Sequence, residues 1–540
     1  MRENWALFVL LSLASIACSY VVDSRLGLGL VDDAYISMRY ARNWADGIGP
    51  FFNPDERVEG YTNFLWTFFL YLGACLGADP PGMATFLGRI CVGLTVPVTF
   101  FLAWNLCGTW IVASLAVVFL VSDAGWWAWS LSGLETPLLA LFFVAALAIH
   151  LRRAKSLCDW IALSVLSVCA ALTRPEGGAL FLFILARELS SARRERCPEP
   201  DEGPRPPDGP RERTRLANLA ILVGIFGGIY LSYLLWRRWT YGLWLPNSFY
   251  AKHGFAGVSL FARGAVYVWR VFAAHPLWAV ILLGIGAGGW KESRFRTAFL
   301  FAAFFLCVVV LSGGDHFTLG RFCVPLLPIL SVLTAAGFQH SCSRLSTLRH
   351  FTEAPRWRAV GMTAIVLSGI PLGVLNASWT FLYREGGRFH RSEVEWAEAW
   401  GRMGLIWRET VEPGTVVAVT TAGALPYVSS LPAIDILGIN DHHISQRDVP
   451  LGSGVAGHEK GDADYVMRRR PQMIQIAPML LFQQRLTRYT EVKMEKVLTY
   501  PAQKELAEHP VFKTSYEYIT TQTRFGYLSY HRYLGKGQSG

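Results

Sequence analysis

Hydrophobic residues gather along the chain in long, nearly unbroken blocks separated by short polar segments. A helix needs roughly 20 apolar residues to cross a bilayer, whereas the buried strands of soluble proteins run for only about 4–8 residues. The blocks therefore predict a polytopic membrane protein with eleven spans. These spans are residues 5–22, 83–104, 109–123, 135–150, 159–173, 176–189, 216–236, 264–290, 297–312, 322–338 and 358–378.

The block at residues 61–77 is apolar enough to be a twelfth span, but the charge pattern argues against it. Loops rich in Arg and Lys are expected on the cytoplasmic side. The basic loops are residues 152–155, 187–215, 291–296 and 344–358. With the N-terminus also inside, a span over 61–77 would place the first of these loops outside, so we interpret 61–77 as a helix in the outer interface. Arg237 and Arg238 then fall on the outer side, where we expect them to contact lipid phosphates or to snorkel.

Two further segments define the domain organisation. Residues 190–215 are polar, charged and rich in proline, as expected of a cytoplasmic linker. Residues 380–540 contain a strand-like run at 415–420, turns rich in Gly, Pro and Asp, and amphipathic stretches, which predict a mixed α/β domain with its own core. We therefore expect an α-helical membrane module over residues 1–379, with a first outer loop over 23–82, followed by an extracytoplasmic α/β domain.

Composition agrees with the membrane interpretation and excludes other classes. Of the 540 residues, 52% are hydrophobic, more than a soluble domain buries. The net charge of +10 comes from the short basic loops, so it does not indicate binding of nucleic acid. The ten cysteines lack the spacing of disulfide or metal motifs, and we expect them to be small buried side chains.

The remaining dense polar segments all fall on the predicted outer side. Loops with unrelated roles would be distributed over both sides, so this convergence indicates one site at the membrane surface, where ionisable residues are functional candidates. The segments lie within residues 32–42, 53–60, 132–136, 174–177, 245–252 and 313–321. The side chains that we expect to contact substrate are Arg39, Arg42, Glu56, Arg57, Glu59, Glu135, Glu176, Asn247 and Asp315.

The acidic pair Asp32-Asp33 follows the first span by about ten residues. One carboxylate at this position could take a proton from an acceptor hydroxyl as that hydroxyl attacks a sugar. The other could raise its pKa, orient it, or help to hold a divalent cation, although the chemistry requires none. The structural alternative is that Asp32 or Asp33 caps the start of a helix over residues 34–45.

Three basic residues at the outer ends of spans could bind a phosphate. Arg174 and Arg321 offer bidentate guanidinium groups and Lys252 a compact charge, and each could stabilise a leaving phosphate. Each could equally be an interface anchor. Glu135, Glu176 and Asp315 could equally pair with these arginines rather than contact substrate.

A family resemblance rests on the first outer loop. Residues 32–66, DDAYISMRYARNWADGIGPFFNPDERVEGYTNFLW, resemble the corresponding loop of the terminal arabinofuranosyltransferases of mycobacteria and corynebacteria, which are GT-C membrane glycosyltransferases. Shorter matches continue into the second domain. They are SGLET, TRPEG, LPNSFYAK, GGDHF, AGALPYVSSLPAIDILGIND and GHEK.

The resemblance implies a GT-C fold with about eleven spans, a polyprenyl-phosphate sugar donor, and a catalytic role for Asp32 and Asp33. It also implies that Asp435, Asp441 and His458 lie near the acceptor or at the domain interface. Ordinary turn chemistry is the alternative for the region of Asp441.

The sequence therefore predicts a glycosyltransferase of the bacterial inner membrane. It would move arabinofuranose, or a similar sugar, from a polyprenyl phosphate to a cell-envelope glycan on the extracytoplasmic face. One alternative is transfer of another polyprenyl-linked sugar to protein or lipid A. The other is a transporter of lipid-linked sugars, but transporters carry broken or polar helices at mid-membrane, whereas here the charges cluster at the ends of the spans.

Overall fold

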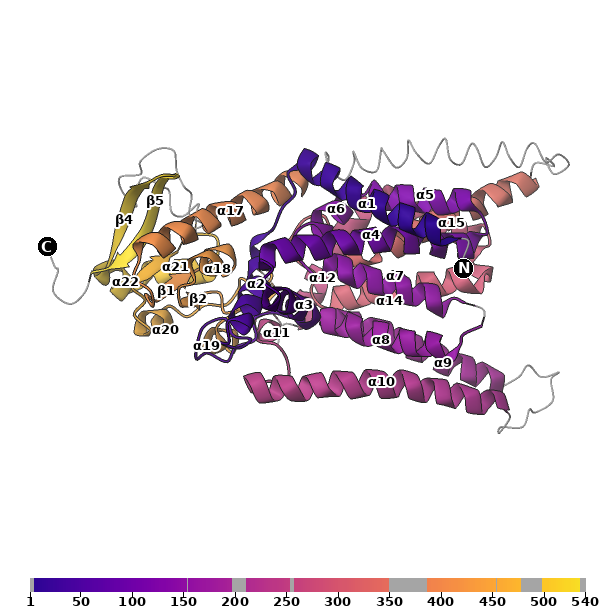
Figure 1. Cartoon of the computed structure of the whole chain (residues 1–540), viewed down its shortest axis with the longest axis horizontal. Helices are drawn as coiled ribbons and strands as arrows, with labels where there is room; N and C mark the ends of the chain where they lie inside the picture. The colour runs from indigo at the N-terminus through magenta and orange to yellow at the C-terminus, as the bar shows by residue number, and fades with distance from the viewer. Residues whose placement is uncertain are drawn as a thin grey trace.

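The computed structural model describes residues 4–152, 154–196, 210–252, 257–348, 386–452, 454–476 and 498–534. A long helical bundle carries a smaller domain at one of its ends (Figure 1). We call this the domain-facing end. The predicted span over 358–378 lies outside the described residues.

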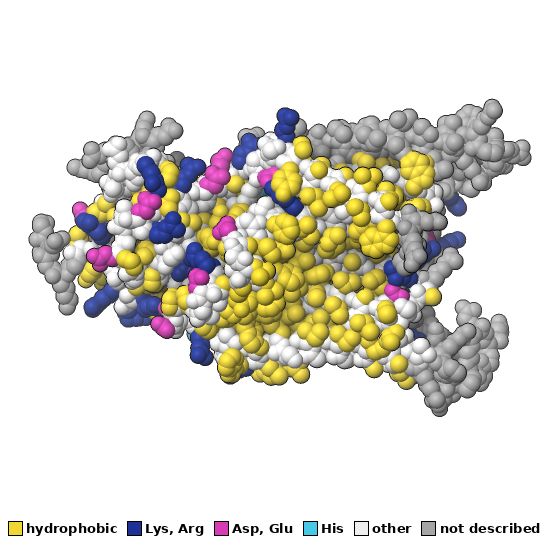
Figure 2. Space-filling model, viewed as in Figure 1, with side chains coloured by type: hydrophobic (Ala, Val, Ile, Leu, Met, Phe, Trp, Pro, Cys, Tyr) yellow, Lys and Arg dark blue, Asp and Glu magenta, His cyan; other side chains and the backbone are white. Residues whose placement is uncertain are grey.

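The bundle helices follow the predicted hydrophobic blocks. They are α1 (Trp5–Leu26), α4 (Pro80–Cys107), α5 (Trp110–Val121), α6 (Ala124–Ser130), α7 (Thr136–His150), α8 (Leu157–Thr173), α9 (Ala179–Arg196), α10 (Pro210–Tyr241), α14 (Ser293–Leu311) and α15 (Leu327–Leu348). Among the described helices, five are long and apolar enough to cross a membrane, and up to seven if each of the bent pairs α5–α6 and α12–α13 counts as one span. Length and composition of the described helices thus support fewer spans than the eleven predicted, because α7 and α8 are shorter apolar helices and α5 reaches spanning length only together with α6. Hydrophobic side chains cover the visible face of the bundle, whereas charged side chains gather over the smaller domain (Figure 2). The chain is a multi-pass membrane protein.

The described parts of the basic loops meet at the end of the bundle away from the smaller domain. Arg294 donates to the carbonyl of Asn105 at 2.6 Å, and Arg187 donates to Thr297 at 3.0 Å. Lys155 lies 3.7 Å from a carboxylate oxygen of Glu188. This gathering of positive charge agrees with the predicted topology, whose absolute orientation stays a prediction.

The block at 61–77 forms α3 (Phe64–Cys75), which packs on α2 (Asp32–Ala45) next to the smaller domain (Figure 1). Its 12 residues rise by only about 18 Å. A bilayer core is roughly 30 Å thick, so α3 has the length of an interfacial helix rather than of a span.

The predicted span 264–290 is not one straight helix. It divides into α12 (Gly257–Ala274), a 3-10 turn η3 (Pro276–Trp278) and α13 (Ala279–Gly286), with an 82° bend between α12 and α13. Gly264 lies against Val310 at the end of α14, and Val271 lies against Gly320 in the next loop. The segment α12 thus lies across the domain-facing end, and only the part from η3 onward enters the bundle. Hydrophobicity alone could not separate these two elements.

The smaller domain is α/β, as predicted. Its sheet has the order β2-β1-β3-β5-β4, with β1 parallel to β2 and β3, and β5 antiparallel to β3 and β4. The strands are β1 (Val417–Val419), β2 (Ala433–Asp435), β3 (Met473–Gln475), β4 (Tyr516–Thr523) and β5 (Gly526–Tyr533). The helices are α17 (Gly386–Thr410), α18 (Ala424–Ser429), α19 (His442–Ser445), α20 (Ala463–Arg468), α21 (Pro501–Glu508) and α22 (Pro510–Ser515). Strand β1 lies within the predicted strand 415–420.

Candidate active site

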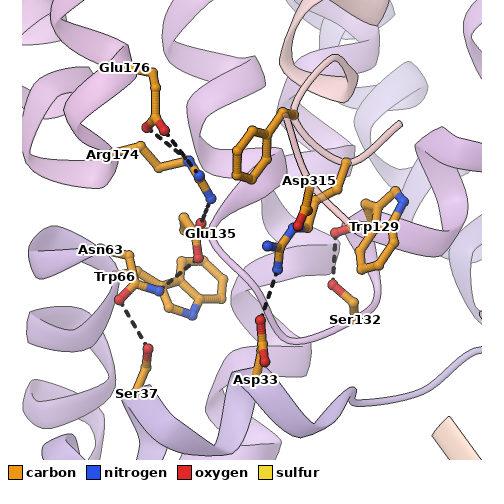
Figure 3. A network of polar contacts seen from close by, with 12 residues as sticks. Asp33, Ser37, Asn63, Trp66, Trp129, Ser132, Glu135, Arg174, Glu176 and Asp315 are labelled. Atoms are coloured by element: carbon orange, nitrogen blue, oxygen red, sulfur yellow. Dashed lines mark hydrogen bonds and ion pairs between the residues drawn. The ribbon is translucent and has the colours of Figure 1, made fainter. Parts of the chain in front are cut away.

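A cavity of about 510 Å³ lies where the bundle meets the α/β domain. Its wall comes from α2, the segment before α3, the loop before α7, the end of α8, the short helix α11 (Asn247–Lys252) and the loop after α14. The residues that the sequence placed in separate outer loops therefore meet here, as Figure 3 shows for Asp33, Glu135, Arg174 and Asp315. Most of the side chains that line the cavity are polar or charged.

Asp33 points into this cavity and keeps 34% of its side chain exposed. Its carboxylate accepts a hydrogen bond from Arg321 at 3.2 Å. Burial raises the pKa of Asp33, but Arg321, Lys252 and His316 more than offset this, so the pKa falls below its usual value. Asp33 is therefore a carboxylate at neutral pH, the protonation state that a general base needs.

Asp32 has a different environment from its neighbour. Its two carboxylate oxygens accept hydrogen bonds from the backbone N–H groups of Gly423 at 3.2 Å and Ala424 at 2.7 Å. These amides begin α18 in the α/β domain. Val31, not either aspartate, is the N-cap of α2, so the predicted alternative of a local cap is wrong. Burial, followed by the charge of Asp33, raises the pKa of Asp32 to about 7.

Two arginines in the cavity wall are held by carboxylates. Arg321 lies 2.5 Å from Asp315 in addition to its bond with Asp33. Arg174 lies 2.6 Å from Glu135 and 3.3 Å from Glu176 (Figure 3). The alternative of structural pairing is thus present for all three acids, and it orients both guanidinium groups toward the cavity.

Lys252 completes the positive charge of the site. It ends α11 and lines the cavity with Arg174 and Arg321. Within the described residues, its ammonium group has no hydrogen bond or ion pair. Burial lowers the pKa of Lys252, and Asp33 partly offsets this effect. Of the three cations in the cavity wall, Lys252 therefore has the fewest contacts that an incoming anion would have to replace.

A larger groove of about 1220 Å³ continues from the cavity. It shares Arg174 and Lys252 with the cavity and then passes apolar side chains, including Phe249, Val308 and Leu311. A ligand with a charged head and a long apolar tail fits this change of lining.

On another side of Asp33, the α/β domain contributes aromatic rings. The ring of His458 stacks on that of Tyr500 at 4.4 Å and meets His316 edge-on at 5.0 Å. Burial and the neighbouring His316 lower the pKa of His458 to about 4, so its imidazole is neutral. Asp33 lies within electrostatic range of both His458 and Tyr500.

The structure places most other predicted substrate contacts outside the cavity, at the junction between bundle and domain. Arg39 is buried and donates to the carbonyls of Phe52, Pro426 and Leu431. The side-chain amide of Asn247 donates to three carbonyls of the α/β domain, at Gly438, Ile439 and Asp441. Both side chains join the two parts of the protein.

Four further acids have local partners. Glu59 is buried and forms an ion pair with Arg237 at 2.7 Å, which accounts for an arginine on the side where the charge rule expects few. Glu56 pairs with Arg469 at 2.7 Å. Asp435 accepts from the backbone N–H of Leu437 and Asn440. Asp441 caps α19 through the N–H of Ile444, which is ordinary turn chemistry.

Two predicted cations remain on or near the surface. The guanidinium of Arg42 lies over the ring of Tyr427 at 4.3 Å, and Arg57 is exposed. For these junction and surface residues, a role in substrate binding stays a prediction.

Sequence reasoning missed Ser37 and Asn63, which line the cavity. Ser37 follows Asp33 by one helical turn, so the period of α2 could have placed both in one cavity. Asn63 donates to Glu135 at 2.7 Å, a contact that no local signal predicts. Across the residues that the structure describes, no three His, Cys, Asp or Glu side chains are grouped to hold a metal ion.

Comparisons with known proteins agree with this architecture. A family model described as a domain of unknown function (DUF8728) matches residues 387–533, which are most of the α/β domain. The terminal beta-(1->2)-arabinofuranosyltransferase of Mycobacterium tuberculosis (strain ATCC 25618 / H37Rv) is 27% identical over 278 residues. That match covers 48% of this chain and 40% of the relative, so the chain is matched over about two fifths of the relative's length.

Solved structures extend the comparison to nearly the whole chain. ArnT from Cupriavidus metallidurans, bound to undecaprenyl phosphate, covers 98% of both chains with a TM-score of 0.55 and 14% identity. The same protein in the apo state gives a TM-score of 0.53 with 15% identity. The chain thus has the fold of ArnT over nearly its whole length, and about half of it is similar in sequence to a terminal arabinofuranosyltransferase, which agrees with the resemblance stated from the sequence.

Proposed function

We propose that this protein transfers a sugar, arabinofuranose or one like it, from a polyprenyl-phosphate donor to a cell-envelope glycan on the extracytoplasmic face of the membrane. One observation carries the proposal. An ionised carboxylate, Asp33, faces Arg174, Lys252 and Arg321 in a cavity that opens into an apolar groove. A base, a phosphate site and a lipid channel are the three parts that such a transfer needs.

The donor would bind with its phosphate at the three cations and its polyprenyl chain along the groove beside α14. Charge-assisted hydrogen bonds from guanidinium and ammonium groups suit a phosphodiester. The binding of undecaprenyl phosphate by the structural neighbour ArnT supports this class of donor for the fold. The similarity to the mycobacterial enzyme supports arabinofuranose as the sugar.

The reaction would proceed as a displacement at the anomeric carbon. Asp33 takes the proton of an acceptor hydroxyl, the hydroxyl oxygen forms a bond to the anomeric carbon, and the bond from that carbon to the phosphate oxygen breaks. The polyprenyl phosphate leaves with the electron pair of the broken bond, and the three cations stabilise its added charge. Arg321 contacts Asp33 directly. Attraction of Arg321 toward the departing phosphate would therefore raise the basicity of Asp33 as the reaction advances.

The test is a transfer assay with purified full-length protein, a short-chain polyprenyl-phosphate arabinofuranose and an arabinan-like oligosaccharide. Asp33→Asn should lower kcat by at least about 100-fold, the usual contribution of a general base. Asp32→Asn serves as the matched carboxylate control and should lower kcat far less. Activity that survives Asp33→Asn contradicts the mechanism, and a folded wild type without transfer contradicts the choice of arabinofuranose.

A further inference from the structure

One helix of the α/β domain presents two buried polar side chains to the candidate site. His390 and Glu393 lie one turn apart on α17 and are 1% and 8% exposed. The ring of His390 meets the ring of Trp129 at 5.1 Å, and the guanidinium of Arg321 lies 5.7 Å from the same tryptophan. This face of α17 therefore packs against the group of residues that contains Arg321 and Asp33.

Neither side chain is satisfied. Within the part of the chain that the structure describes, both ring nitrogens of His390 lack a hydrogen-bond partner. The carboxyl group of Glu393 has no hydrogen bond or ion pair among those residues either, and its oxygens, unlike the ring nitrogens of His390, are not among the fully enclosed polar atoms, so they keep some accessible surface. Buried polar groups in folded proteins are nearly always bonded, and an unsatisfied one calls for a functional explanation. A hydrogen-bonding group of a bound substrate would supply the missing partner and so provide such an explanation.

The charges around Glu393 determine its protonation. The charged and titratable groups within electrostatic range of Glu393 are Asp32 and Asp33 on α2, Asp315 and Arg321 in the loop after α14, and Tyr500 before α21. His390 lies one turn away on the same helix. Burial, then the charges of Asp33 and Asp32, raise the pKa of Glu393 to about 8, and Arg321 only partly opposes them. At neutral pH the side chain is thus a carboxylic acid, which can donate a hydrogen bond.

We propose that Glu393 is an acceptor-positioning residue. Its neutral carboxyl group donates a hydrogen bond to a hydroxyl of the acceptor sugar and so holds the attacking hydroxyl beside Asp33. This inference rests on the transferase function proposed above and adds the source of acceptor specificity. The membrane module would supply the base and the phosphate site, and the α/β domain would select the acceptor.

The first measurement compares the KM for the acceptor with the KM for the donor. It uses the full-length protein with the same donor and the same arabinan-like oligosaccharide. Loss of one neutral hydrogen bond corresponds to roughly 3- to 10-fold in binding. Glu393→Ala should therefore raise the acceptor KM by roughly 3- to 10-fold and leave the donor KM within about twofold. Glu395→Ala, an exposed glutamate on the same helix, should change neither constant.

The second measurement is the pH dependence. In the wild type, the acceptor KM should rise as pH passes about 8, because Glu393 ionises and can no longer donate. Glu393→Gln carries an amide that donates at every pH. It should keep a KM near that of the wild type at pH 7 and remain flat up to pH 9.

The possible results separate the two proposals. If the wild type transfers sugar but Glu393→Ala leaves the acceptor KM unchanged or raises both KM values alike, this inference is wrong while the transferase function stands. A Glu393→Gln variant that still shows the alkaline rise also overturns it. If the folded wild type transfers no sugar from this donor, the transferase proposal fails, and this inference fails with it.

Discussion

Consecutive carboxylates on the first turn of α2 have opposite environments. Asp33 contacts a guanidinium group in an open cavity, whereas Asp32 accepts two backbone hydrogen bonds at the start of α18. The packing there is close, because a Cβ atom on Gly423 would lie 2.0 Å from the carbonyl oxygen of Asp32. A glycine is needed at position 423 for this approach.

We predict that Gly423→Ala destabilises the protein by about 1–3 kcal/mol, the usual cost of overpacking a tight contact. Thermal unfolding should show a lower Tm. Gly228→Ala is the control, since a Cβ atom there meets nothing within 4 Å and alanine favours a helix. A Gly423→Ala variant with an unchanged Tm would mean that the approach of α18 to α2 is looser than described.

The sequence located the first outer loop as the origin of the site but could not distinguish its two aspartates. Both stand at the start of the same helix, and the amides that bind Asp32 lie about 390 residues away along the chain. The same reason applies to Arg39 and Asn247, which donate hydrogen bonds to carbonyls of the other domain. Residue type and spacing predict the chemistry of a side chain, and only tertiary packing decides which side chain performs it.

At the scale of elements, α12 differs most from its prediction. Its apolar side chains include exposed Val258, Phe261 and Trp269, whereas Tyr267 and Val271 pack inward. A helix that packs one face on the protein and exposes apolar side chains on the other can lie along a membrane interface. The sequence pattern predicts an apolar block long enough to span the membrane. Nothing in that block indicates whether the helix axis crosses the membrane or lies along its surface.

We predict equal membrane depth for labels at positions 261 and 269. Phe261→Cys and Trp269→Cys, each carrying a fluorophore, should be quenched equally by lipids that bear quenchers at defined depths. In a membrane-crossing helix, eight residues would separate the labels by about 12 Å. The exposed pair Leu231 and Trp239 on α10 provides this crossing control. A depth difference of about 12 Å between 261 and 269 would restore the span predicted from sequence.

At the scale of the whole molecule, the junction between bundle and domain concentrates buried acids. Burial comes first among the causes that raise the pKa of Asp32 to about 7 and of Glu393 to about 8. The folded state therefore holds protons that the unfolded chain has already lost. The stability that these groups contribute is full below about pH 4 and is lost as pH rises through 7 to 8.

We predict that the Tm of the wild type falls between pH 7 and pH 8.5. Glu393→Gln should reduce this fall by an amount on the order of 1 kcal/mol, because the amide has no charge to bury. Differential scanning fluorimetry at several pH values measures it, with Glu395→Gln as the exposed control. The window above pH 7 avoids the titration of His390 and His458, whose lowered pKa values act in the opposite direction at lower pH. Parallel pH profiles for Glu393→Gln and the wild type would contradict the burial of a proton at this position.

The general arrangement of the molecule followed from the chain pattern to a large extent. Hydrophobic blocks located the bundle helices, and polar segments far apart in the sequence meet at one end, as Figure 1 lets the reader follow. These features depend on membrane thickness and on the cost of burying charge, which act on every segment separately. The docking of the α/β domain depends on complementary surfaces of the domain and the bundle. It therefore cannot be predicted from any single segment of the sequence.

The bond between Asp32 and the start of α18 limits how freely the two parts of this protein can be exchanged in evolution. An α/β domain taken from a relative would need a glycine at the position of Gly423. It would also need two backbone N–H groups there that are free to donate to Asp32. Otherwise a side chain at position 423 would collide with Asp32, and the amides at the start of α18 would lose their carboxylate partner. Substitutions at positions 32 and 423 should therefore be inherited together rather than independently, and a chimaera of two such proteins should fold stably only when both positions come from the same parent.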